Sequence, residues 1–210
     1  VPGDLIETGV WRGGACIYMR AILKFHNITD RKVWVCDSFE GLPAPDPANF
    51  PADLGQDLHT FPILQVPLEI VKENFDKVGM LDDQVVFVKG WFKDTLPTLP
   101  IEKIALLRLD GDLYESTIQS LEALYPKLSQ GGVCIVDDYG DMEVCKQAVD
   151  DYRARNNITE PMIFTDKAEI YWVKGDYALA KPKPKIAMII CTWDNRGMLN
   201  NCLHSVVNYA

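Results

Sequence analysis

Two apolar segments of this chain end abruptly in carboxylates, and this feature restricts the folds that the chain can adopt. Residues 106–109 and 133–136 are mostly apolar and have the length of a strand, which is typical of strands buried on both faces of a parallel sheet. In such sheets the carboxyl ends of neighbouring strands open into the crevice that binds ligands. Four acids follow the two segments: Asp110, Asp112, Asp137 and Asp138.

These four carboxylates predict a metal site. Residues two apart on an extended chain share a face, so Asp110 and Asp112 point into the same cavity if strand geometry continues through Gly111. Carboxylates gathered in a partly dry crevice repel one another unless they share protons or hold a cation. We therefore expect a metal site with oxygen ligands at this edge of the sheet.

Strand-like and helix-like segments alternate along the rest of the chain. Strand-like runs at residues 4–8, 31–37 and 84–89 precede or follow helical patterns, and two more runs at 162–164 and 170–173 close the series. This order predicts an α/β fold with a Rossmann-like, doubly wound sheet that is mostly parallel and has an antiparallel last strand.

A glycine-bearing turn links the first strand to the first helix. Its pattern is Glu7-x-Gly9-x-x-x-Gly13, with Gly14 next. Glycine lets the backbone bend sharply and lets a ligand approach the main chain, and a helix N-terminus offers unpaired N–H groups. The turn lacks the Gly-Lys-Ser/Thr of a P-loop, so a purely structural turn stays an alternative.

Three other segments at the same edge also suit ligand binding. Asp37 ends the second predicted strand, where an acid commonly accepts hydrogen bonds from ribose hydroxyls, although a solvated strand end or a helix cap is the alternative. Trp91 and Phe92 follow the third strand and could cover a flat ring or belong to the core. Residues 43–67 have no clear period and predict a mobile cover, or a crossing with no role.

The charge balance and the cysteines narrow the partners and the compartment. The 210 residues carry 30 acidic against 21 basic side chains without a basic block, so we expect a small-molecule partner and no nucleic acid. The six cysteines are scattered without zinc-finger spacing, which indicates reduced thiols in a cytoplasmic protein. No apolar run reaches the roughly 20 residues that a membrane span needs.

Five motifs carry a family resemblance: ETGVWRGG (7–14), DSFEGLP (37–43), KGWF (89–92), LDGDLYEST (109–117) and DDYG (137–140). In this order they resemble the S-adenosylmethionine-dependent class I methyltransferases and, more closely, the macrocin O-methyltransferase (TylF-type) family. The resemblance implies Mg²⁺-dependent methyl transfer from S-adenosylmethionine to a sugar hydroxyl of a glycoside or natural product.

The resemblance also implies roles for individual residues. Asp112 would be the general base, and Asp110, Asp137 and Asp138 would ligate the metal. The turn that binds the methionine part of the cofactor would comprise Glu7, Thr8, Gly9, Gly13 and Gly14. Asp37 and Ser38 would bind the ribose, and Gly90 and Trp91 would border the adenine.

Three parts are expected along the chain. Residues 1–177 form the methyltransferase domain, with its N-terminal segment missing, because the chain starts at Val1 and enters a strand almost at once. Residues 178–185 contain a proline-broken basic linker. Residues 186–210 resemble the truncated start of a family 2 type (GT-A) glycosyltransferase, which implies a covalent fusion in a longer chain. A homo-oligomer is also expected.

Two other functions fit the same residues. Clustered aspartates at strand ends also serve metal-dependent phosphoryl transfer or hydrolysis, although the missing P-loop and Asp37 argue against that class. A non-catalytic cofactor-binding module fused to a glycosyltransferase is the other alternative, and the intact set of four aspartates argues against it.

Overall fold

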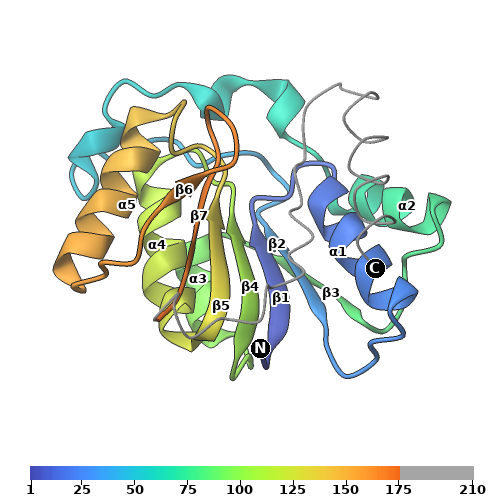
Figure 1. The fold of residues 1–210 in the computed structure, drawn as a ribbon. Helices are drawn as coiled ribbons and strands as arrows, with labels where there is room; N and C mark the ends of the chain where they lie inside the picture. Colours follow the sequence, from blue (N-terminus) through green and yellow to red (C-terminus); the bar gives the residue numbers. More distant parts are fainter. Residues whose placement is uncertain (176–210) are drawn as a thin grey trace.

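The computed structural model describes residues 1–175, which are organised around a seven-stranded sheet (Figure 1). The strands lie in the order β3-β2-β1-β4-β5-β7-β6. Neighbouring strands are parallel except where β7 pairs with β5 and β6, so the predicted fold class is confirmed. The strand bounds are β1 Asp4–Thr8, β2 Val33–Asp37, β3 Val85–Lys89, β4 Ile104–Leu109, β5 Leu128–Val136, β6 Ile163–Phe164 and β7 Ile170–Val173.

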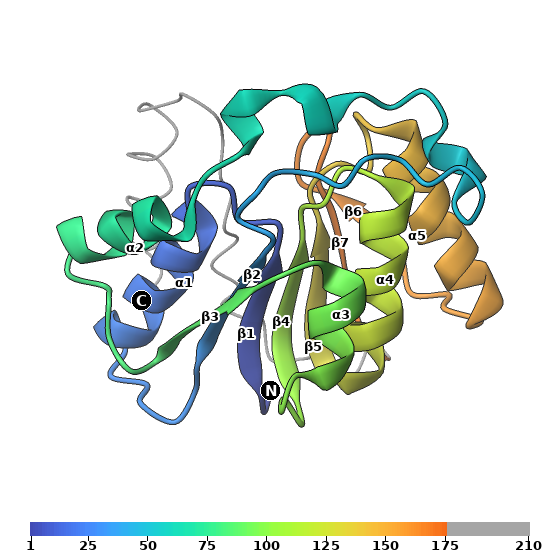
Figure 2. The same ribbon diagram turned by 180° about the vertical axis from the view of Figure 1, so that it is seen from behind.

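Helices cover both faces of the sheet (Figures 1 and 2). One face carries α1 and α2, and the other carries α3, α4 and α5. Successive strand residues point to opposite faces, so Leu5 belongs to the apolar cluster of α1 and α2 while Ile6 belongs to the cluster of α4 and α5. The helix bounds are α1 Gly14–Phe25, α2 Leu68–Lys77, α3 Phe92–Thr95, α4 Tyr114–Leu124 and α5 Glu143–Arg155.

Residues 43–67, hereafter the bridging segment, cross above the carboxyl ends of the strands (Figure 1). The segment was expected to lack regular structure, but it contains three short 3₁₀ helices at 51–53, 58–60 and 62–64. Buried Asp53 accepts hydrogen bonds from the backbone N–H groups of Tyr114 (2.8 Å) and Glu115 (2.9 Å), at the start of α4. The indole of Trp11 donates to the carbonyl of Ile63. The segment is therefore tied to both sides of the crevice.

The remaining predictions concern the cysteine thiols, the lack of a membrane-spanning helix and residues 178–210. Cys16, Cys36, Cys134 and Cys145 are buried free thiols. Among the described residues, no helix combines the length and apolar character that a membrane crossing requires. The predicted linker at 178–185 and the glycosyltransferase-like start at 186–210 lie outside the described residues, and the fusion and the homo-oligomer stay predictions.

Candidate active site

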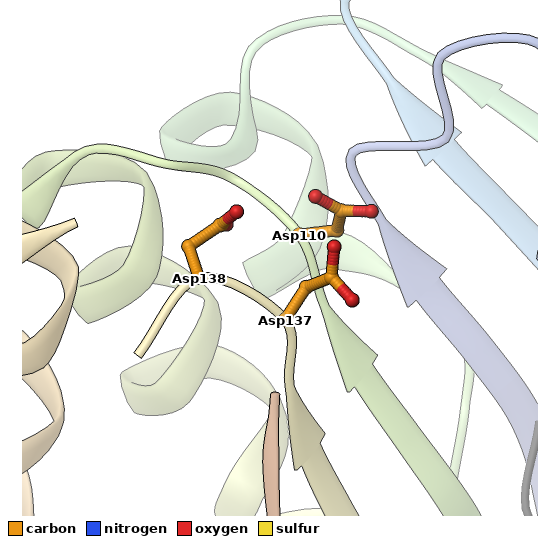
Figure 3. Close-up of side chains that lie close together, drawn as sticks. All are labelled: Asp110, Asp137 and Asp138. Carbon is orange, nitrogen blue, oxygen red and sulfur yellow. The ribbon is translucent and has the colours of Figure 1, made fainter. Parts of the chain in front are cut away.

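Three carboxylates meet at the carboxyl edge of the two central strands β4 and β5. Asp110 follows the end of β4, and Asp137 and Asp138 follow the end of β5, where Leu109 and Val136 are paired in register. One oxygen from each carboxylate lies within 4.8 Å of the others (Figure 3). We refer to Asp110, Asp137 and Asp138 as the acidic cluster. Its proximity follows from the rule that parallel strands end at one edge of the sheet.

Asp112 takes a different position from the one that the sequence suggested. Strand geometry stops at Leu109, and the chain turns sharply, with the N–H of Leu113 donating to the carbonyl of Gly111 at 2.6 Å. Asp112 itself has φ +57°. The strand geometry that the sequence argument required therefore does not extend to Asp112, although the charge of Asp110 still acts on the Asp112 carboxyl group. Asp112 borders the acidic cluster through its backbone N–H, which donates to Asp138 Oδ2 at 3.1 Å.

Arg108 is a site residue that the sequence analysis missed. Its side chain is buried on β4, with the residue 1% exposed. Nη1 donates to Glu7 Oε1 at 2.5 Å and to Asp110 Oδ2 at 2.6 Å, and Nη2 donates to Asp137 Oδ1. The available signal was a single charged residue inside an otherwise apolar strand, because such a residue is buried only when it is paired.

The acidic cluster has strongly perturbed proton affinities. Burial and then the charge of Asp110 raise the pKa of Asp112 to about 7 and the pKa of Asp137 to about 8. Burial also raises the pKa of Asp138 well above its ordinary value, with further contributions from Asp110, Asp112 and Asp137. One guanidinium does not neutralise this many acids, so the cluster binds protons or a further cation at neutral pH.

The donor set fits a divalent cation with a preference for oxygen. Arg108 binds one oxygen of Asp110 and one oxygen of Asp137, so it leaves the second oxygen of each carboxylate unoccupied, and the Asp137 carboxyl group also shares a hydrogen bond with Glu169. Asp138 Oδ2 accepts the N–H of Asp112, so its Oδ1 is also left over. Three carboxylate oxygens suit Mg²⁺, which usually takes only a few protein carboxylates and keeps the remaining positions for water or substrate.

The glycine turn, residues 7–14, lies beside the acidic cluster. Gly9 has φ +81°, and a Cβ there would lie 1.7 Å from the backbone oxygen of Asp110, so only glycine fits. A Cβ on Gly14 would meet nothing within 4 Å, and no side chain caps the N-terminus of α1. The start of α1 therefore has unfilled space and backbone N–H groups without a side-chain acceptor.

Asp37 and Ser38 brace the glycine turn from the end of β2. Asp37 Oδ2 accepts the N–H of Val10 at 2.7 Å, and Oδ1 accepts the N–H of Phe39 at 2.7 Å. Burial raises the pKa of Asp37, and these backbone hydrogen bonds oppose the rise. The Ser38 hydroxyl donates to the carbonyl of Gly41 at 2.6 Å. Both side chains thus have structural contacts in addition to the predicted ribose role.

The remaining predicted cofactor residues divide between interior and surface. Glu7 and Thr8 are buried on β1, where the Glu7 carboxylate accepts the Cys16 thiol as well as Arg108. Both side chains are therefore enclosed in the interior, on opposite faces of the sheet. Gly90 and Trp91 lie just after β3, and Trp91 is 36% exposed, so its ring is available to a ligand.

The strand order defines a class I methyltransferase fold, and so do the features at the carboxyl edge of the sheet. These features are a glycine turn before α1 and acids at the ends of β2, β4 and β5. A family model described as macrocin-O-methyltransferase (TylF) matches residues 1–174. The chain belongs to this family.

Curated relatives and a solved structure agree with this membership. Demethyldecarbamoylnovobiocin O-methyltransferase of Streptomyces niveus is 54% identical over 173 residues, covering 82% of this chain and 66% of the relative. Mycinamicin III 3''-O-methyltransferase of Micromonospora griseorubida is 48% identical over 175 residues, covering 82% and 68%. The structure of the O-methyltransferase NovP is 52% identical with a TM-score of 0.82, covering 84% and 73%. The chain thus spans about two thirds of the length of these curated relatives.

Proposed function

We propose that this chain is a metal-assisted O-methyltransferase that transfers a methyl group from S-adenosylmethionine to a sugar hydroxyl of a glycosylated natural product. The observation that carries the proposal is the acidic cluster, three carboxylates within 4.8 Å of one another, beside a glycine turn at a helix N-terminus without a side-chain cap. The names of the relatives, which include a 3''-O-methyltransferase, support a sugar hydroxyl as the acceptor. The buried free thiols support a cytoplasmic location.

In this proposal each group of site residues binds either the metal or one part of S-adenosylmethionine. Asp110, Asp137 and Asp138 would hold Mg²⁺, which would supply positive charge that lowers the pKa of an acceptor hydroxyl. The glycine turn and the start of α1 would hold the methionine part of S-adenosylmethionine, Asp37 and Ser38 its ribose, and Gly90 with Trp91 its adenine. Holding both reactants in register accounts for a large part of the rate in such bimolecular reactions.

Asp112 takes the hydroxyl proton in this proposal. Its turn places it next to Asp138, at the border of the acidic cluster. The acceptor oxygen bonds to the methyl carbon as the carbon–sulfur bond breaks, and the electron pair of that bond stays on sulfur. The products are a methyl ether, S-adenosylhomocysteine and a proton on Asp112.

Two measurements test the function. Calorimetric titration of S-adenosylmethionine, with and without Mg²⁺, should show binding to the wild type and loss of binding in Asp37→Ala. Transfer of labelled methyl to a panel of demethylated glycosides should then fall about 10²- to 10⁴-fold in Asp112→Asn, as expected for loss of a general base.

The matched control is Asp141→Asn, which changes an exposed aspartate in the turn after β5 and should keep full activity. No binding of S-adenosylmethionine by the folded wild type would refute the proposal. Binding without turnover on any acceptor would favour the non-catalytic module.

A further inference from the structure

Arg108 links the interior of the sheet to the acidic cluster. It lies opposite Glu7 on the neighbouring strand β1, and its guanidinium group reaches Asp110 and Asp137 at the ends of β4 and β5. The Glu7 carboxylate below it is itself fixed, because it accepts the Cys16 thiol from α1. The guanidinium is therefore held by Glu7 on its inner side, and on its outer side it contacts the carboxylates of Asp110 and Asp137.

The contacts are specific to the planar fork of arginine. One nitrogen serves Glu7 and Asp110, and the other serves Asp137. Nε is buried without a hydrogen-bond partner and lies 3.9 Å from Glu169 Oε2. A lysine ammonium is a single point of charge and cannot reproduce this spread of donors.

We propose that Arg108 is a positioning residue that presents Asp110 and Asp137 to the metal. By holding the inner oxygen of each carboxylate, it directs the outer oxygens toward the position between Asp110, Asp137 and Asp138. It also holds the Asp110 and Asp137 carboxyl groups close together before the metal binds. This inference rests on the proposed metal-assisted function.

A positioning role for Arg108 and its charge alone predict opposite changes in Mg²⁺ affinity when Arg108 is replaced. Removing a positive charge near a cation site should strengthen cation binding by Coulomb attraction. Removing a group that orients ligand carboxylates should weaken it, and loss of such partners typically costs about 10- to 100-fold in metal affinity. Arg108→Met separates the two effects, and Arg108→Lys keeps the charge while removing the fork.

The experiment is calorimetric titration of Mg²⁺ into the full chain, with circular dichroism and thermal melting to confirm folding. We expect about 10-fold or greater weakening in both Arg108→Lys and Arg108→Met. The control is Arg155→Lys, which changes an exposed arginine at the end of α5 that pairs with Glu122 of α4. This variant should bind Mg²⁺ like the wild type. Unchanged or tighter binding in a folded Arg108 variant would overturn the positioning role.

A wild-type measurement decides the matter if both variants fail to fold. The side-chain ¹⁵N–¹H signals of Arg108 should show slow rotation of the guanidinium and should shift while remaining resolved when Mg²⁺ is added. Averaging to a freely rotating signal on saturation with Mg²⁺ would overturn the proposal. Wild type that binds no Mg²⁺ would instead remove the metal from the proposed function and this inference with it, whereas binding that is indifferent to Arg108 would overturn this inference alone.

Discussion

Replacing Asp53 by alanine should destabilise the protein strongly, although Asp53 lies in a short 3₁₀ helix of the bridging segment and outside the sheet. Its carboxylate is fully buried and accepts two backbone N–H groups at the start of α4, a helix that has no side-chain cap of its own. Loss of an N-cap costs about 0.5–2 kcal/mol, and a hydrogen bond to a charged group contributes about 1.5–3 kcal/mol. Two such bonds at a buried site place the expected loss at about 2–4 kcal/mol.

The assay is urea denaturation followed by circular dichroism, comparing free energies of unfolding at constant m-value. Asp46→Ala is the control, because Asp46 lies in the same bridging segment and its carboxylate makes its hydrogen bonds at the surface, chiefly to Asn49, so its replacement should cost far less stability than that of Asp53. Proteolysis of the bridging segment should accelerate in Asp53→Ala, because its tie to α4 is gone. Equal losses in the two variants would refute the assignment of Asp53 as the cap of α4.

Three further predictions follow from other contacts. Gly9→Ala should unfold the chain or lower its melting temperature sharply, because a Cβ there lies 1.7 Å from a backbone oxygen, whereas Gly14→Ala should leave the melting temperature nearly unchanged; equal effects would contradict this account. The pKa of Asp82 is lowered, chiefly by its hydrogen bonds to buried Arg20, so the stabilisation it gives is present above pH 3.8 and is lost as the pH falls through its folded pKa. Its partial exposure limits that contribution to about 1 kcal/mol, and acid denaturation of Asp82→Asn should lack this pH-dependent loss. Under the proposed function, Mg²⁺ at 100 times its dissociation constant should stabilise the wild type by about 2.7 kcal/mol, and Asp137→Asn should lose this thermal shift.

The sequence predicted those features that depend on where strands end. The meeting of Asp110, Asp137 and Asp138 required only that two neighbouring parallel strands stop at one edge. The class of fold, a mostly parallel sheet with an antiparallel last strand, followed from the alternation of apolar runs, helical patterns and glycine turns. These are local patterns read against a general rule of sheet architecture.

The features that escaped prediction depend on contacts between distant residues or on a single turn. Arg108 pairs with Glu7 across 101 positions, and Asp53 caps a helix that begins 61 positions later. A charged residue in an apolar strand indicates that Arg108 is paired, but no local pattern identifies its partner or the helix that Asp53 caps. The backbone at Asp112 was not predicted, because the strand ends at Leu109 and Asp112 adopts a left-handed conformation with φ +57°.

The position of β1 has a consequence for synthesis of the chain. β1 lies between β2 and β4, but its partner β4 ends about a hundred residues later, at Leu109. At about 5–20 residues per second, a ribosome needs roughly 5–20 s to deliver β4 after β1 has emerged. During that interval Glu7 has no Arg108 to pair with, and the β4-facing edge of β1 stays open to other strands. Pairing of β1 with β2 does not close this edge, because β2 occupies the opposite edge of β1, so the β4-facing edge of the nascent chain stays unpaired until β4 has been made.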